Sequence, residues 1–152
     1  QCTDLDKLTN ICNNQAITAY IGFDCTASSL HVGSLLQIMV LKLMQKNGHR
    51  PIVLLGGGTT LIGDPSGKSS TRKILEKNEI KRNIKSIKKV FNKILDTSNK
   101  KTKPIFVDNY DWLAKLNYID FLRNVGIHFT INKMLSFDNK IRKRTVFKLH
   151  GV

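Results

Sequence analysis

Short apolar runs alternate along the chain with longer segments in which apolar residues recur at helical spacing. Residues 16–23, 51–55 and 104–107 are apolar runs of strand length. Residues 35–45 have a helix-forming composition. The predicted helix ends at Asn47-Gly48, a typical helix stop. Strand, helix and strand in this order predict a right-handed βαβ unit with parallel strands. Four large side chains of the first run are expected to be buried: Ile17, Tyr20, Ile21 and Phe23.

One long amphipathic helix is predicted over residues 71–95. Its apolar positions recur mostly at steps of three and four: Ile80, Ile84, Ile87, Phe91, Ile94 and Leu95. Basic residues fill the other face: Lys81, Arg82, Lys85, Lys88 and Lys89. A loop rich in Gly, Asp and Pro is predicted over residues 59–70, a polar connection over 96–103 and a short helix over 117–125. Together these elements predict an α/β domain.

The positive charge is concentrated in the second half of the chain. Twenty-five Lys and Arg face eleven Asp and Glu, a net charge of +14. Residues 1–76 carry 7 basic and 5 acidic side chains, whereas residues 77–152 carry 18 and 6. A net charge of +12 on one half favours nucleic acid as a partner, since neutralised phosphates release counterions. A solvated basic helix without a partner is the alternative interpretation.

Several protein classes are excluded by what the sequence lacks. The sequence has no run of about 18 apolar residues, so it predicts no transmembrane helix. No signal peptide is visible either. We therefore expect a cytoplasmic or organellar protein without a membrane partner. The three cysteines, Cys2, Cys12 and Cys25, form no C-x-x-C pair. We therefore expect free thiols rather than disulfides, and no metal site.

The junction between the first strand and the first helix is the first candidate site. It reads Tyr20-Ile-Gly-Phe-Asp-Cys-Thr-Ala-Ser-Ser-Leu-His-Val-Gly-Ser34. Ligands of doubly wound sheets bind where strands end, and a helix N-terminus offers backbone N–H groups to anions. Gly33 allows close approach to the backbone, and His31 can donate to a phosphate from one ring nitrogen.

The second candidate site is the glycine-rich segment Gly56–Arg72. Its Gly67-Lys68-Ser69 resembles the end of a Walker A motif, but that motif needs a glycine where Ile62 stands, so the spacing argues against a P-loop. Lys68 and Arg72 are four residues apart and suit a phosphate, and Asp64 could receive an amine. A glycine-rich surface turn with solvated charges is the alternative.

Taken together, the two segments resemble the class I aminoacyl-tRNA synthetases, and specifically the bacterial-type tyrosyl-tRNA synthetases. The first segment is similar to that family's strand-to-helix signature, with His31-Val-Gly-Ser34 in the place of its HIGH tetrapeptide. G-G-G-T-T-L-I-G-D-P-S-G-K and the later V-D-N-Y-D-W also match. The likeness covers residues 1–140, the expected nucleotide- and tyrosine-binding part of the catalytic domain, whereas the basic tail 141–152 does not follow it.

The resemblance implies a class I Rossmann-like parallel sheet flanked by helices, incomplete at its C-terminal side. It implies that ATP and tyrosine form tyrosyl-adenylate, which charges tRNA(Tyr), with Mg²⁺ on the ATP phosphates and a homodimer as the assembly. Implied nucleotide-binding residues are Gly22, Asp24, Thr26, His31 and Gly33. Implied catalytic residues are Thr26, His31, Gly33, Ser34, Lys68 and Arg72. Implied tyrosine-binding residues are Tyr20, Asp64 and Asn109.

Individual roles also follow from the resemblance. Thr26 and His31 would contact the transition-state phosphates, while Lys68 and Arg72 would hold the leaving pyrophosphate. Tyr20 would bind the phenolic oxygen of the substrate. Asp64 would bind the α-ammonium group of tyrosine, and Asp24 would lie at the base of the adenylate site. Asn109 and Trp112 would support the pocket from behind.

Three departures from the family pattern keep alternatives open, and the tail 141–152 is one of them. Ser34 stands where many members carry a second histidine, and no Lys-Met-Ser-Lys-Ser-type loop is present in the sequence. One alternative is a nucleotidyltransferase that uses H-x-G-H-type chemistry on a small cofactor precursor. The other is an inactive remnant that binds nucleic acid non-specifically through its basic half.

Overall fold

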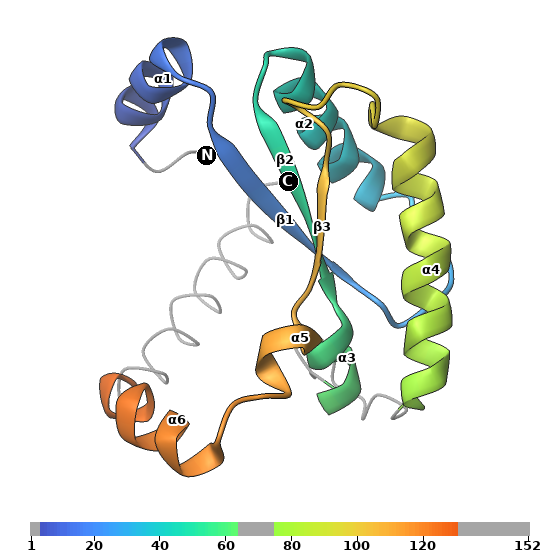
Figure 1. Cartoon of the computed structure of the whole chain (residues 1–152), viewed down its shortest axis with the longest axis vertical. Helices are drawn as coiled ribbons and strands as arrows, with labels where there is room; N and C mark the ends of the chain where they lie inside the picture. The colour runs from blue at the N-terminus through green and yellow to red at the C-terminus, as the bar shows by residue number, and fades with distance from the viewer. Residues whose placement is uncertain (1–3, 64–74, 131–152) are drawn as a thin grey trace, which may run out of the picture. The chain divides into compact units, whose positions relative to one another are not determined.

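The structure is a computed structural model of the chain, and it describes residues 4–63 and 75–130. The chain divides into two compact units, Gln1–Ala114 and Lys115–Val152. The described part of the first unit contains α1 (Leu5–Asn14), β1 (Thr18–Asp24), α2 (Ser34–Lys46), β2 (Arg50–Gly56), α3 (Gly57–Ile62), α4 (Lys77–Ile94), β3 (Ile105–Asp108) and α5 (Tyr110–Leu113) (Figure 1). The described part of the second unit contains α6 (Tyr118–Asn124) and the 3₁₀ helix η1 (Gly126–His128).

The three strands form one parallel sheet in the order β1-β2-β3. Tyr20 of β1 pairs in register with Ile52 of β2, and Leu54 of β2 pairs with Val107 of β3. Helix α2 connects β1 to β2, because neighbouring parallel strands need a crossover connection. The predicted parallel α/β arrangement is confirmed, and each of the three apolar runs overlaps a strand.

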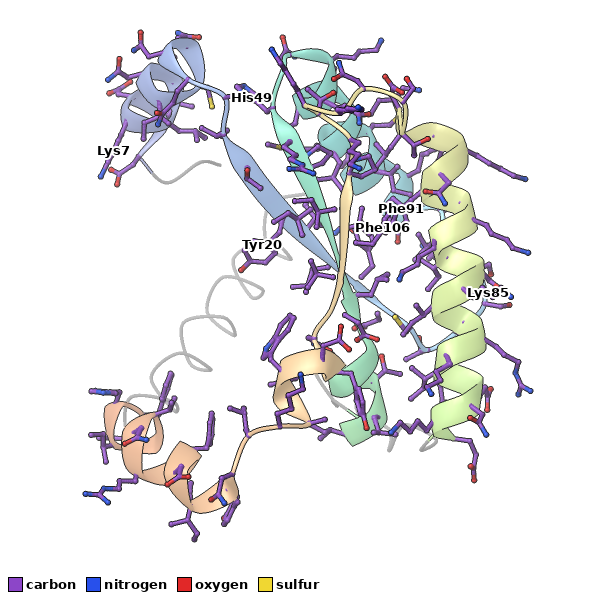
Figure 2. All side chains as sticks on the ribbon, viewed as in Figure 1. Lys7, Tyr20, His49, Lys85, Phe91 and Phe106 are labelled. Atoms are coloured by element: carbon purple, nitrogen blue, oxygen red, sulfur yellow. The ribbon has the colours of Figure 1, made fainter. Side chains whose placement is uncertain are left out.

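One face of the sheet packs against α2 and α4 and forms the core (Figure 1). The aromatic centre of this core is Phe91 of α4, which is fully buried. Its ring lies edge-on to Phe23 at a centroid distance of 4.8 Å and edge-on to Phe106 at 6.2 Å. Figure 2 shows Phe91 and Phe106 between α4 and the sheet. The apolar series predicted for α4 is confirmed by the burial of Ile80, Ile87 and Phe91.

The opposite face of the sheet is partly exposed. It carries Tyr20, Ile52, Leu54 and Val107, which alternate along their strands with the buried core residues. Tyr20 is 67% exposed, so the prediction that it is buried is wrong. The physical reason is the two-residue period of a strand, which puts Tyr20 on the face opposite Phe23.

Two predicted boundaries need correction. Residues 59–62 are not loop, because Gly57–Ile62 form α3, which ends at Gly63 in the left-handed region with φ +78°. Helix α4 begins at Lys77 and not at Thr71, because Glu76 has extended backbone angles that a helix cannot include. Residues 71–74 lie outside the described part. Helix α1 had no counterpart among the predicted elements.

The second unit is described here for residues 115–130 only. Its helix α6 confirms the predicted helix over 117–125. Asn117 caps this helix, because its Oδ1 accepts from the backbone N–H groups of Ile119 at 3.0 Å and Asp120 at 3.2 Å. The predicted boundary between residues 140 and 141, and the basic tail beyond it, lie outside the described residues.

Candidate functional site

A polar cavity of about 460 Å³ lies where β1 ends and α2 begins. Its lining residues come from the end of β1, from the connecting loop and from the first turn of α2. The lining residues are Gly22, Phe23, Asp24, Thr26, Ala27, Ser29, Leu30, His31, Ser34 and Gln37. The structure therefore brings together, around one cavity, Gly22, Asp24, Thr26, His31 and Ser34 from the sequence-predicted site.

His31 is oriented by the backbone of Gly33. The Gly33 N–H donates to Nδ1 of His31 at 3.0 Å, so Nδ1 acts as an acceptor and the neutral ring carries its proton on Nε2. This leaves Nε2–H as a donor. A Cβ on residue 33 would lie 3.3 Å from the same Nδ1, a close approach that favours glycine there. The pair can present one directed N–H to an anion in the cavity.

The loop between Asp24 and Thr26 is fixed by side chains from two other helices. The Cys25 N–H donates to Thr60 Oγ1 of α3 at 3.1 Å, and Asn83 Nδ2 of α4 donates to the Cys25 carbonyl at 3.0 Å. Both contacts are buried. Sequence reasoning missed Thr60 and Asn83, although Asn83 is a polar interruption in the apolar series of α4, and that signal was available.

Cys25 itself is a structural residue. Its side chain is fully buried, and burial together with the nearby Asp108 carboxylate raises the pKa of the thiol to about 12. The thiol is therefore protonated at neutral pH and is a poor nucleophile. Cys12 and Cys25 are free cysteines, which confirms the prediction for these two.

An apolar groove of about 330 Å³ lies on the exposed face of the sheet. Its lining residues are Tyr20, Ile52, Leu54, Val107 and Trp112. Tyr20 and Gly22 lie two residues apart on β1 and on the same face, so the groove and the polar cavity follow each other along one strand. No atom of another residue lies within 4 Å of the position that a Cβ on Gly22 would take, so the space beside this glycine is open.

The glycines that follow β2 are engaged in packing. Asp108 Oδ1 accepts from the Gly57 N–H at 3.1 Å, and Asn109 Oδ1 accepts from the Gly58 N–H at 2.7 Å. Asn109 also donates to Thr59 Oγ1 at 3.2 Å and is 8% exposed. These N–H groups begin α3 and are satisfied internally. The surface-turn interpretation is therefore wrong for residues 57 and 58, which are buried.

Three of the sequence-predicted site residues, Asp64, Lys68 and Arg72, lie outside the described residues. In the part that the structure does describe, no group of three or more His, Cys, Asp or Glu side chains could hold a metal ion. Among the same residues, no helix is long and apolar enough to cross a membrane.

Comparison with known proteins gives these features a family context. The family model of the class I tRNA synthetases (W and Y) matches residues 12–150. The tyrosine–tRNA ligase of Pelagibacter ubique is 65% identical over 143 residues, which are 93% of this chain and 35% of that protein. The tyrosine–tRNA ligase of Rickettsia typhi is 57% identical over 139 residues, which are 91% of this chain and 34% of that protein. The chain thus spans about a third of the length of these curated relatives.

A solved structure is similar to the fold as well. The C-terminally truncated mitochondrial tyrosyl-tRNA synthetase of Aspergillus nidulans matches with a TM-score of 0.73 and 25% sequence identity, covering 93% of this chain and 43% of that one. This likeness confirms the predicted class I synthetase fold, a parallel sheet flanked by helices.

Proposed function

Because the chain belongs to the class I tRNA synthetases of the tryptophan and tyrosine type, we propose that it forms the nucleotide- and tyrosine-binding part of a tyrosine–tRNA ligase. The complete reaction would join tyrosine to ATP as tyrosyl-adenylate, release pyrophosphate and then charge tRNA(Tyr). Tyrosine is favoured over tryptophan because the relatives at 65% and 57% identity are both named tyrosine–tRNA ligases.

One observation carries this proposal: an apolar groove and a polar cavity adjoin along β1. Two residues of a strand span about 6.6 Å, so Tyr20 in the groove and Gly22 in the cavity are close neighbours. A tyrosine whose aromatic ring lies in the groove would have its carboxylate beside Gly22. A phosphate in the cavity would then face that carboxylate, which is the geometry that adenylate formation needs.

In this arrangement the tyrosine carboxylate oxygen attacks the α-phosphorus of ATP. A P–O bond forms to the carboxylate as the bond from the α-phosphorus to the bridging oxygen breaks, and pyrophosphate leaves. His31, Thr26 and Ser34 line the cavity, and they carry the donors that would bind these phosphates: the Nε2–H of His31 and the hydroxyl groups of Thr26 and Ser34. Donors held in advance by the fold stabilise charge that develops on the phosphate oxygens. Gly33 allows the nucleotide to approach the start of α2 closely.

The tyrosine end of the site is proposed to use Tyr20, Asn109 and Trp112. The Tyr20 hydroxyl would hydrogen-bond the phenolic oxygen of the substrate, and Trp112 would line the groove beside the ring. Asn109 would support the pocket from behind, since its side chain is hydrogen-bonded to α3. Asp64 remains the proposed partner of the α-ammonium group.

The phosphate end of the site is proposed to use Lys68 and Arg72 for the leaving pyrophosphate and Asp24 at the base of the adenylate. ATP would arrive as its magnesium complex. Mg²⁺ is usually bound through substrate phosphates and waters with one or two carboxylates rather than by a dedicated protein cage. The chemistry that the ion would supply is neutralisation of charge on the phosphates.

The assembly and compartment are proposed on the same basis. A homodimer in the cytoplasm follows from the family resemblance. The dimer is supported by a set of large apolar side chains within residues 115–130 that are exposed and could be covered by a second copy. They are Leu116, Tyr118, Ile119, Phe121, Leu122, Val125, Ile127 and Phe129. Analytical ultracentrifugation at several concentrations would test the dimer, and a purely monomeric species at micromolar concentration would contradict it.

The decisive experiment uses a chimera in which this chain replaces the matched third of the Pelagibacter ubique relative. ATP–pyrophosphate exchange that depends on tyrosine, and not on tryptophan or phenylalanine, is the expected result. Exchange that needs no amino acid would favour the nucleotidyltransferase alternative. No exchange by a chimera that folds like its parent would refute the ligase proposal.

A further inference from the structure

The outer side of α4 carries a dense set of cations that the proposed ligase chemistry does not use. We define the α4 basic face by five side chains, all exposed: Lys81, Arg82, Lys85, Lys89 and Lys93. Figure 2 shows Lys85 pointing away from the sheet. The row from Lys81 to Lys93 extends for about 18 Å at a rise of 1.5 Å per residue.

The helical period separates this face cleanly from the core. At 100° per residue, the five cations fall within a sector of about 120° on the helical wheel. The buried residues Ile80, Asn83, Ile87 and Phe91 fall on the opposite side and pack against the sheet. The basic face therefore lies toward solvent because the other face of α4 is fixed in the core.

The charge of this face is not neutralised by the residues that the structure describes. Glu79 is the single carboxylate of α4, and it lies outside the basic sector. None of the five cations pairs with a carboxylate in the part of the chain that the structure describes. Lysines four residues apart on a helix also repel each other, and this repulsion weakens the helix. Three such pairs occur on this face: Lys81 with Lys85, Lys85 with Lys89, and Lys89 with Lys93. A polyanion on this face would relieve that repulsion.

We propose that the α4 basic face binds the phosphate backbone of duplex RNA without reading base sequence. A surface helix binds a membrane through its apolar face, and that face of α4 is buried in the core. Stacking on unpaired bases needs exposed aromatic side chains, and Phe91, the single aromatic residue of α4, is fully buried. RNA is favoured over an acidic protein because the chain belongs to a family of tRNA synthetases. This contact surface goes beyond the proposed catalytic site and does not depend on its chemistry.

The test measures binding of the 152-residue chain to a fluorescein-labelled RNA hairpin with a stem of about 16 bp, by fluorescence anisotropy at several salt concentrations. The variant is Lys81→Gln with Lys85→Gln and Lys89→Gln. The matched control is Lys7→Gln with Lys46→Gln and Lys115→Gln, which removes the same charge at exposed positions elsewhere. A charge-preserving variant replaces the same three α4 lysines by arginine. Circular dichroism checks that every variant keeps its helix content.

We expect the association constant for the hairpin to fall as the salt concentration rises. The slope of its logarithm against the logarithm of the salt concentration should be smaller in magnitude by about 3 in the glutamine variant of α4. Its affinity at 0.1 M salt should be lower by about tenfold or more, while the arginine variant binds as the parent does. Equal losses in the α4 variant and the control would overturn the proposal, because net charge alone would then explain binding. No binding of the hairpin at low salt, or binding only to phosphatidylglycerol vesicles, would overturn it as well. None of these outcomes bears on tyrosine-dependent exchange.

Discussion

Replacing Asn83 removes the donor through which α4 holds the loop between β1 and α2. Asn83 is 6% exposed, and its Nδ2 donates to the Cys25 carbonyl at 3.0 Å. Without this donor, a buried carbonyl oxygen loses its partner, which costs about 1–3 kcal/mol. We therefore expect Asn83→Ala to lower the free energy of unfolding by at least that amount, since a small void is added to the lost hydrogen bond.

The isosteric change Asn83→Asp gives a sharper test because its effect depends on pH. An ionised carboxylate cannot donate to the Cys25 carbonyl, whereas a protonated carboxyl group can. Burial raises the pKa of the introduced carboxyl above its unfolded value of about 3.9. The stability that the protonated carboxyl group contributes is therefore fully present below the unfolded-state pKa. It is lost as pH rises through the folded-state pKa. The loss amounts to as much as about 1.4 kcal/mol per pH unit.

The assay is urea unfolding followed by circular dichroism at intervals from about pH 4 to pH 8. Asn92→Asp is the matched control, because Asn92 is exposed on the same helix and the chemical change is the same. The free energy of unfolding of Asn83→Asp should fall relative to the parent across this range. That of Asn92→Asp should not fall, because an ionised carboxylate at this exposed position is close to Lys88 and Lys89 on the same helix. Parallel pH profiles for the two variants would refute the idea that Asn83 holds the loop by donating to it.

Four further predictions concern the site and its support. In the chimera, His31→Ala should slow adenylate formation by about 100-fold with little change in the KM for tyrosine, and unchanged pre-steady-state kinetics would remove His31 from the mechanism. Tyr20→Phe should reduce the preference for tyrosine over phenylalanine by about tenfold, the value of one neutral hydrogen bond; an unaltered ratio of kcat/KM values would contradict its assigned role. Gly57→Ala should destabilise the fold by about 1–3 kcal/mol in urea unfolding, since its Cβ would lie 2.8 Å from the carboxyl carbon of Asp108; an unchanged midpoint would count against this packing. Residues 1–152 alone should not charge tRNA, because they span about a third of their curated relatives, and charging above background would reveal a complete site.

Local sequence signals determined the strands, the main helices and most of the polar cavity. The cavity residues Gly22, Asp24, Thr26 and His31 come from one continuous segment, so their proximity needs only the strand-to-helix turn. The periodicity of α4 predicted its buried face for the same reason, since apolar spacing is a property of neighbouring residues. The resemblance to the class I synthetases also rested on continuous motifs, and the family match over residues 12–150 confirms it.

The tertiary structure decided which groups support the site. Gly57 and Gly58 looked like a surface turn, yet Asp108 and Asn109, about fifty residues later, cap their N–H groups and create α3. Asn83 holds the Cys25 carbonyl across a separation of 58 residues. Local propensity carries no information about such partners, because a buried polar group is stable only when the folded chain brings its acceptor or donor to it. The exposure of Tyr20 follows the same logic: the strand was visible in the sequence, but only the packing of α2 and α4 on one face of the sheet decided which side remained open.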